Sequence, residues 1–164
     1  MKSTGETMGI ADDFARAFML AQQAIQPIPQ TGTVFISVPD ADKPEALAVA
    51  QQFHELGFKL IATNGSAEYF NAHGIPAVAI NKVKEGRPHI VDAIVSEDVQ
   101  VVINTETGAP DSRRDSFSIR RAALVNRVVY YTTVAGASAA VRGLAGAREG
   151  WTPRTLQQWQ GKKL

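Results

Sequence analysis

The sequence contains no cysteine, which excludes a disulfide framework, a zinc–thiolate site and a cysteine nucleophile. Its three histidines share no metal-ligand spacing. It has no apolar run near the ~18 residues that span a bilayer and, over Met1 to Gly5, no apolar core of a signal peptide. An excess of one charge is also missing, because 17 basic and 16 acidic side chains leave a formal charge of +1. We therefore expect a soluble, cytoplasmic protein with no metal site, no membrane contact and no nucleic acid partner.

Five short apolar runs dominate the middle of the 164-residue chain, which is long enough for one domain with a single core. The runs are 33–38, 58–62, 76–80, 99–103 and 128–132. They are rich in Val and Ile and do not alternate apolar with polar residues, which is typical of strands covered on both faces. They predict a mainly parallel sheet of five strands.

The segments between these runs carry helix signals. Asp42 precedes Pro44 and Glu45, so it is expected to cap a helix that ends at Gly57. Further helices are expected over Ser66–Ala72, from Arg87-Pro88-His89 onward, over Arg114–Arg127 and over Ala135–Ala147. Because strands and helices alternate, we predict the α/β class, as an open three-layer sandwich with helices flanking the sheet and right-handed crossovers.

The two ends of the chain differ from its middle. Residues 1–30 contain one amphipathic stretch, Asp12 to Ile25, followed by a Pro/Gln segment that cannot extend a helix. Residues 150–164 hold both tryptophans, Trp151 and Trp159. We divide the chain into a linker and helix (1–30), the α/β domain (31–149) and a C-terminal tail (150–164).

Ligands of open parallel sheets bind beyond the carboxyl ends of the strands. After the second run, Thr63-Asn64-Gly65-Ser66 turns from strand into helix, where free backbone N–H groups and the helix dipole suit a phosphate or carboxylate. An ordinary helix cap is the alternative. Lys43 and Lys82 follow neighbouring strands, which favours the anion site, although each is also compatible with a solvated lysine.

Other chemistries find less support. The sequence has no Gly-x-Ser-x-Gly elbow and no Gly-x-x-x-x-Gly-Lys phosphate loop. His54 and His73 lie within and at the end of predicted helices, which favours surface or capping roles. A group of arginines on or beside one helix indicates a solvated face, an anion-facing helix start or a contact with an acidic partner. These arginines are Arg113, Arg114, Arg120, Arg121 and Arg127.

Three segments carry a resemblance to a known family. They read Thr63-Asn64-Gly65-Ser66-Ala67, Asn81-Lys82-Val83-Lys84-Glu85-Gly86-Arg87-Pro88-His89 and Asn104-Thr105. In them the sequence resembles the methylglyoxal-synthase-like domain that closes the large chain of carbamoyl-phosphate synthase. The opening 3–9 and the stretch 14–18 resemble the segment that joins this domain to the preceding ATP-using half. The resemblance implies a methylglyoxal-synthase-like fold.

The resemblance also implies a regulatory domain that binds nucleotide monophosphates, IMP or UMP, and has no catalytic residue of its own. The positions that match the family's contacts to effector phosphate and ribose are Lys43, Thr63, Ser66, Lys82 and Asn104. With Asn64, Gly65 and Thr105 beside them, these residues form the predicted effector site. Glu106 departs from the family, which has a hydroxyl residue there, so the effector's identity stays open.

A second site is implied at an interface with the preceding half of the large chain. Tyr130 and Thr132 match the family's contribution to an ornithine site, and Tyr131 replaces the acidic residue between them. The implied partners are the remainder of the large chain, the small glutaminase subunit and further copies of the chain. ATP, Mg²⁺ or Mn²⁺, and K⁺ belong to the parent enzyme of pyrimidine and arginine biosynthesis, and no cofactor is expected in this domain.

Two alternatives remain. A free methylglyoxal synthase needs the same phosphate site plus a carboxylate base. The family's base follows a Gly-Gly pair that is missing here, so Asp111 or Asp115 would have to supply it. A module without ligand, in which the first helix and the tail dock a partner, is the other alternative.

Overall fold

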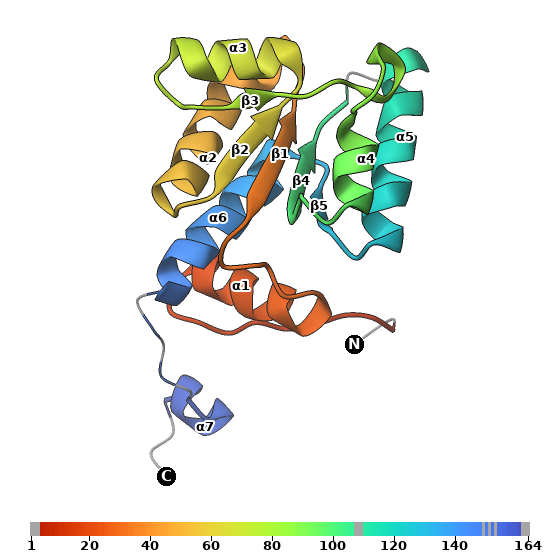
Figure 1. Cartoon of the computed structure of the whole chain (residues 1–164). Helices are drawn as coiled ribbons and strands as arrows, with labels where there is room; N and C mark the ends of the chain where they lie inside the picture. Colours follow the sequence, from red (N-terminus) through yellow and green to blue (C-terminus); the bar gives the residue numbers. More distant parts are fainter. Residues whose placement is uncertain (1–3, 107–109, 149, 151, 153, 162–164) are drawn as a thin grey trace.

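Five parallel strands form a single sheet in the order β3-β2-β1-β4-β5 (Figure 1). The computed structural model describes residues 4–106, 110–148, 150, 152 and 154–161, with the side chains of 110–113 outside the description. The strands are β1 (Thr33–Ser37), β2 (Lys59–Ala62), β3 (Val78–Ala79), β4 (Val101–Asn104) and β5 (Val129–Tyr131). The predicted α/β class is confirmed, and every described strand pair is parallel.

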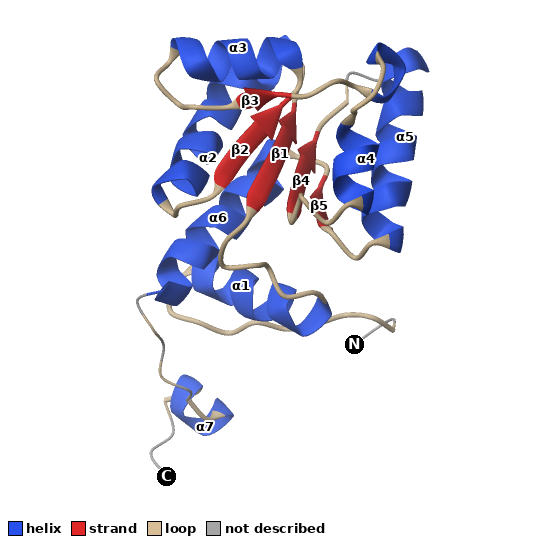
Figure 2. Ribbon diagram, viewed as in Figure 1, coloured by secondary structure: helices blue, strands red, loops and turns tan. Residues whose placement is uncertain are grey.

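Helices cover both faces of the sheet (Figure 2). The helices are α1 (Phe14–Ile25), α2 (Lys43–Glu55), α3 (Asn64–Ala72), α4 (Ile90–Val95), α5 (Pro110–Val125), α6 (Val134–Arg148) and α7 (Leu156–Trp159), with short 3-10 turns η1 (Asp40–Asp42) and η2 (Val83–Glu85). Within β1, Val34 and Ile36 face the core shared with α1, α2, α3 and α6, whereas Phe35 faces α4 and α5. The predicted three layers are therefore present.

The edge strand β3 is an exception to the predicted coverage on both faces. It spans only Val78–Ala79, pairs only with β2, and leaves Val78 68% exposed. Expecting full coverage there was wrong, because a strand at the sheet edge has a strand partner on one side, and both residues of β3 stay exposed although α3 contacts the strand.

The start of α2 also differs from the expectation. Asp42 was expected to cap this helix, but its side chain makes no cap hydrogen bond. The turn η1 runs directly into the helix and gives Asp42 a helical backbone (φ −91°, ψ −11°), whereas a capping residue adopts an extended one. The Asp42 carboxylate instead accepts a hydrogen bond from the Thr105 hydroxyl at 2.8 Å. The predicted end of the helix is confirmed by Gly57, whose φ of +84° suits glycine.

The N-terminal helix α1 packs on α6, and the tail with α7 extends beyond the end of α6, away from the sheet (Figure 1). A Cβ at Gly143 would come within 2.9 Å of both the Ala15 carbonyl oxygen and the Met19 Cβ, so glycine permits the close packing of α1 on α6. From the tail, Arg154 pairs with Asp12 at 2.9 Å. Of the two tryptophans, Trp159 lies under the Arg154 guanidinium and Trp151 falls outside the described residues.

Within the described ranges, no helix is both long and apolar enough to cross a bilayer. The same residues contain no group of three or more His, Asp or Glu side chains arranged to hold a metal ion.

Candidate functional site

The carboxyl end of β2 leads into α3 through buried hydroxyl side chains. Thr63 and Ser66 are 5% and 1% exposed. Thr63 Oγ1 donates to Ser66 Oγ at 3.4 Å, and Ser66 Oγ donates to the Val38 carbonyl at 3.5 Å, so both hydrogen bonds are long and weak. The Thr63 N–H donates to the Ile36 carbonyl at 3.3 Å and the Ser66 N–H to the Thr63 carbonyl at 2.9 Å. The backbone N–H groups of Asn64 and Gly65 are therefore the donors that this helix start offers to an anion.

The Lys43 ammonium lies against the same helix start. A Cβ at Gly65 would be 3.4 Å from Lys43 Nζ, and only 15% of the lysine side chain is exposed. Its ion-pair partner is Asp40, at 2.7 Å, a side chain that is 95% exposed. A hydrogen bond from Lys43 and its charge hold the pKa of Asp40 below its usual range. The cation therefore adds to the positive end of the α3 dipole, an arrangement that an anion stabilises. We call these residues, Lys43 with 63–66, the α3 cradle.

A hollow of about 170 Å³ opens beside the α3 cradle, between the ends of β1 and β4. The β1–β4 register pairs Ser37 with Asn104, which brings both to this edge. The lining residues of this β1–β4 hollow are Ser37, Val38, Pro39, Lys82, Asn104, Thr105, Asp115, Ser116 and Ile119. Val38 connects the two parts of the site, because it lines the hollow and accepts the hydrogen bond from Ser66 in the α3 cradle.

Lys82 is held at this hollow by a short turn. Its backbone N–H donates to Glu85 Oε2 at 2.8 Å, which closes the 3-10 turn η2. The side chain thus projects from a fixed loop beyond β3, as expected for a residue after a parallel strand.

The floor of the β1–β4 hollow is a buried polar network. Asn104 is 3% exposed, and its Nδ2 donates to both Ser116 Oγ and Tyr130 Oη at 2.9 Å. Ser116, also 3% exposed, was missed from the sequence, whereas Asp115, considered above as an alternative base, does line the hollow. The available signal was periodicity, since Ser116 shares a helical stripe with the buried Ile119 and Ala123.

A second hollow, of about 430 Å³, lies on the other side of Thr105. Its lining residues are Asp42, Glu45, Thr105, Glu106, Arg120, Thr132, Thr133, Val134 and Ala135, and we call it the carboxylate hollow. Glu106 Oε1 accepts from Arg120 at 3.2 Å, and the Arg120 guanidinium lies 5.6 Å from the centre of the Tyr130 ring. Thr132 therefore lies in this hollow, and Tyr130 is linked to it through Arg120.

Tyr131 points to the opposite face of the sheet from Tyr130. Its side chain belongs to the core under α6 and is 8% exposed. Burial raises the pKa of the Tyr131 phenol well above its usual value, and its hydroxyl has no hydrogen-bond partner in the described part of the chain. The residue that replaces the family's acidic side chain therefore does not line either hollow.

The histidines do not come together. His54 is exposed on α2, and His73 ends α3 with Nδ1 2.7 Å from the Tyr69 carbonyl oxygen. His89 caps α4 by accepting from the Asp92 backbone N–H. Surface and capping roles for His54 and His73 are thus confirmed. Asp111, considered as a catalytic base, lies outside the described side chains.

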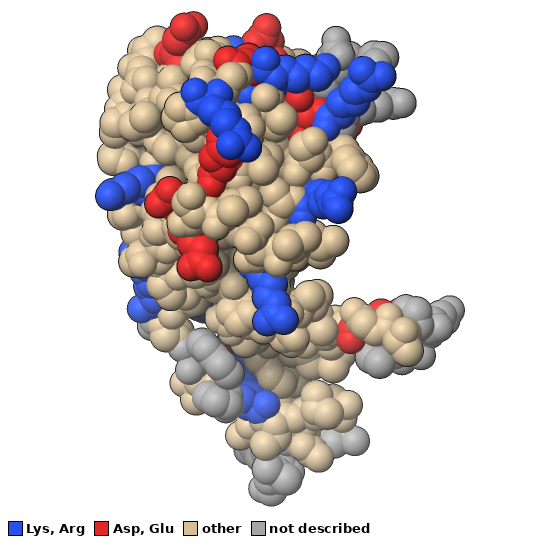
Figure 3. Space-filling view, turned by 45° about the vertical axis from the view of Figure 1, so that its right-hand side comes forward, with Lys and Arg blue, Asp and Glu red and all other residues tan. Residues whose placement is uncertain are grey.

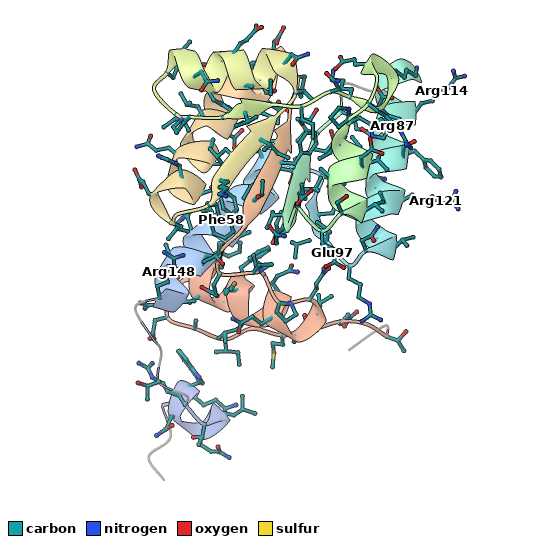
Figure 4. The ribbon with its side chains drawn as sticks, viewed as in Figure 1. Phe58, Arg87, Glu97, Arg114, Arg121 and Arg148 are labelled. Atoms are coloured by element: carbon teal, nitrogen blue, oxygen red, sulfur yellow. The ribbon has the colours of Figure 1, made fainter. Side chains whose placement is uncertain are left out.

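Positive and negative side chains are interspersed over the face drawn in Figure 3. Arg87, Arg114 and Arg121 project from the α4–α5 side of the molecule (Figure 4). Arg87 pairs with Asp92 at 3.4 Å, whereas Arg114 and Arg121 are exposed. Arg113, predicted in the same group, falls among the side chains that are not described.

Comparison with known proteins identifies the relatives of this chain. The family model of the MGS-like domain matches residues 45–132. The chain is 47% identical over 162 residues to the carbamoyl phosphate synthase large chain of Gemmatimonas aurantiaca, covering 97% of this chain and 15% of that protein. It is 41% identical over 172 residues to the carbamoyl phosphate synthase large chain, C-terminal section, of Methanopyrus kandleri, covering 96% and 32%. It thus spans a small part of these relatives.

A solved structure shares the fold. The crystal structure of methylglyoxal synthase from Elizabethkingia anophelis superposes with a TM-score of 0.54 and 14% sequence identity, over 70% of this chain and 79% of that one. At this identity the likeness concerns the fold alone.

Proposed function

Because the chain belongs to the MGS-like domain family, we propose that it is the regulatory domain of a carbamoyl phosphate synthase large chain and binds a nucleotide monophosphate. The observation that carries this proposal is the Lys43 ammonium, largely buried against the N-terminus of α3. A cation held beside the positive end of a helix dipole is favourable when an anion binds between them.

The effector's phosphate is bound by the α3 cradle. Its oxygens accept hydrogen bonds from the backbone N–H groups of Asn64 and Gly65, from the hydroxyls of Thr63 and Ser66, and from the Lys43 ammonium. Lys82 adds a second ammonium from the turn beyond β3. The weak hydrogen bonds of the two hydroxyls, at 3.4 and 3.5 Å, support this role because little is lost when a phosphate oxygen replaces them.

The nucleoside extends into the β1–β4 hollow. Thr105 and Ser116 offer hydroxyl groups to ribose, and Asn104 offers its amide oxygen, because both hydrogens of its amide are bonded to Ser116 and Tyr130. IMP and UMP are the proposed effectors. No cofactor takes part in this binding.

The carboxylate hollow is the proposed contribution to an ornithine site. Asp42, Glu45 and Glu106 supply negative charge for an ammonium group, and Thr132 supplies a hydroxyl. Tyr130 acts through the Arg120 guanidinium that covers its ring. The remainder of the large chain completes this site and carries out the ATP-dependent ligation, together with the small glutaminase subunit.

Calorimetric titration and thermal melting with IMP, UMP and inorganic phosphate test the proposal. A ligand at about 100 times its Kd raises stability by about 2.7 kcal/mol, which gives a clear rise in Tm. Lys43→Met is expected to abolish this rise while leaving the ligand-free fold intact, since the methylene stem is replaced by a side chain of similar length. Equal binding by the wild type and Lys43→Met, or no binding by the wild type, would refute the proposed phosphate site and favour a module without ligand.

Methylglyoxal synthase activity is the second candidate. It is favoured by the Asp115 carboxylate, which lines the same hollow as Lys82 and is able to serve as a base toward a bound triose phosphate. Incubation of the purified chain with dihydroxyacetone phosphate decides between the two, because formation of methylglyoxal, lost in Asp115→Asn, would establish catalysis.

A further inference from the structure

Asn64 and Gly65 form the only Asn-Gly pair in the sequence, whose other four asparagines precede Ala, Lys, Thr and Arg. An asparagine deamidates when the backbone nitrogen of the next residue attacks the carbon of its side-chain amide. Glycine in the next position makes this attack easiest, because it has no Cβ to hinder the approach of the two groups. Asn64 therefore differs in intrinsic reactivity from the other asparagines.

The structure leaves both reacting groups of this pair accessible. Asn64 and Gly65 are exposed in the first turn of α3, and within the described part of the chain neither the Asn64 side chain nor the Gly65 N–H has a hydrogen-bond partner. A Cβ at Gly65 would be 3.4 Å from Lys43 Nζ, so a cation lies close to this residue at the positive end of the α3 dipole. The cation and the dipole favour loss of the N–H proton, because both stabilise the negative charge that it leaves on the nitrogen.

The side chains of the other asparagines are held in place. Asn71 both donates to and accepts from the Ala77 backbone, at 2.8 and 3.0 Å. Asn81 and Asn126 each donate to a backbone carbonyl, at 3.4 and 2.8 Å. Asn104 is 3% exposed, and both of its amide hydrogens are bonded. These four side chains are less free to turn toward the next backbone nitrogen, so they serve as internal references for Asn64.

We propose that Asn64 is a deamidation site and that its conversion closes the α3 cradle to anions. The Gly65 nitrogen forms a bond to Asn64 Cγ, the Cγ–Nδ2 bond breaks, and the proton of the Gly65 N–H leaves with that nitrogen as ammonia. Water then opens the resulting cyclic imide to aspartate or isoaspartate, so the net change is uptake of water and release of ammonia. The conversion needs no oxidant, reductant or other reactant.

The product places a carboxylate where the proposed function needs donors. The backbone N–H groups of Asn64 and Gly65 are the donors that the start of α3 offers to an anion. A negative charge beside them repels a phosphate and competes with it for the Lys43 ammonium. Isoaspartate also lengthens the main chain by a carbon atom, which displaces the Gly65 N–H. Closure of the cradle rests on the proposed function, whereas the deamidation itself does not.

The test incubates the purified chain at mildly alkaline pH and follows it by peptide mass spectrometry and by calorimetric titration of IMP. We expect Asn64 to convert at least about tenfold faster than each of the other asparagines, which corresponds to a barrier lower by about 1.4 kcal/mol. The number of IMP sites per chain should fall in step with the converted fraction. Asn64→Asp, without incubation, should bind IMP at least about tenfold more weakly than the wild type, because of the added like charge.

Two variants separate deamidation from general damage. Asn64→Gln keeps a neutral amide that cyclises more slowly, so its own titration should be the same before and after incubation. Gln23→Glu adds a negative charge at an exposed position on α1, away from the α3 cradle, and should bind IMP as the wild type does.

Conversion of Asn64 no faster than that of the other asparagines, or equal IMP binding by Asn64→Asp and the wild type, would overturn the inference while leaving the effector site intact. Failure of the unmodified wild type to bind IMP would instead overturn the proposed function and the closure of the cradle. The conversion rate would still decide whether Asn64 deamidates.

Discussion

At the scale of single residues, the site is governed by which charges and hydrogen-bonding groups face a ligand and which are used inside the protein. Lys43 is a largely buried cation whose carboxylate partner is almost fully exposed, and it lies at the positive end of a helix. Asn104 is the opposite case, a neutral side chain whose two amide hydrogens are both used inside the protein. The first group favours an incoming anion, and the second gives the hollow a rigid floor.

Lys82→Ala is the residue-level prediction for the effector site. We expect it to weaken IMP binding by roughly 1.5–3 kcal/mol, since a charge-assisted hydrogen bond to phosphate is lost. The Tm without ligand should barely change, because an exposed loop lysine has little packing to lose. Isothermal calorimetry measures the effect, with Lys59→Ala at the amino end of β2 as the control. An unchanged IMP affinity would remove Lys82 from the site.

Ser116→Ala is the corresponding prediction for the floor. The substitution removes the hydroxyl that accepts a hydrogen bond from the buried Asn104 amide. We therefore expect the free energy of unfolding to fall by about 1–3 kcal/mol. Urea denaturation measures it. Ser118→Ala, two residues along α5, removes a hydroxyl that donates to the Arg114 carbonyl in the preceding helical turn, and should change stability by less than about 0.5 kcal/mol. Equal effects of the two substitutions would contradict the structural role of Ser116.

At the scale of elements, the order of strands brings the functional loops together. The loops after β1, β2, β3 and β4 all emerge at one edge of the sheet because their strands are parallel and adjacent. The helices then hold the loops in place, because α3 begins directly after Thr63 and α5 presents Ser116 to Asn104. The N-terminal helix contributes differently, by packing on α6 away from this edge.

Gly143→Ala tests that packing. Its Cβ would lie 2.9 Å from an α1 backbone oxygen, so α1 must shift, and we expect a destabilisation of about 1–3 kcal/mol. Gly146→Ala is the matched control, because its Cβ would meet the flexible Arg16 stem at 3.4 Å. Thermal melting of both variants, with IMP binding as a second readout, should show that Gly143→Ala lowers Tm while the affinity stays near that of the wild type.

At the scale of the whole molecule, the fold has binding surfaces but spans only a small share of its relatives. The chain covers 15% of the Gemmatimonas protein. Its described side chains include no group arranged to hold a metal ion. The small share agrees with the proposal that the chain regulates a reaction carried out elsewhere in a longer protein.

The purified chain is therefore predicted to hydrolyse no ATP, with or without bicarbonate and ammonia. Release of inorganic phosphate, followed spectrophotometrically, measures this, and the chain should still bind IMP in the same buffer. ATP turnover that survives rigorous purification would contradict the assignment of the chain to regulation.

Much of the architecture was determined by the sequence, because local patterns encode it. Apolar Val- and Ile-rich runs marked all five strands, and Gly57 marked a helix end. The segments 63–67 and 81–89 carry the resemblance to the MGS-like domain family, whose model matches residues 45–132. Strand order along the chain also indicated which loops share an edge, so Lys82, Asn104 and Thr105 were expected together before their hollow was known.

Only the tertiary structure decided which side chains meet across the site. Asp42 bonds Thr105, 63 residues away, although the local pattern favoured a helix cap. Ser116 belongs to the floor of the β1–β4 hollow because the start of α5 lies against Asn104 at the end of β4. Tyr131 lies outside both hollows because successive strand residues point to opposite faces of the sheet. Periodicity along the chain predicts on which face of its helix or strand a residue lies. Contacts between distant segments depend on how whole helices and strands pack together.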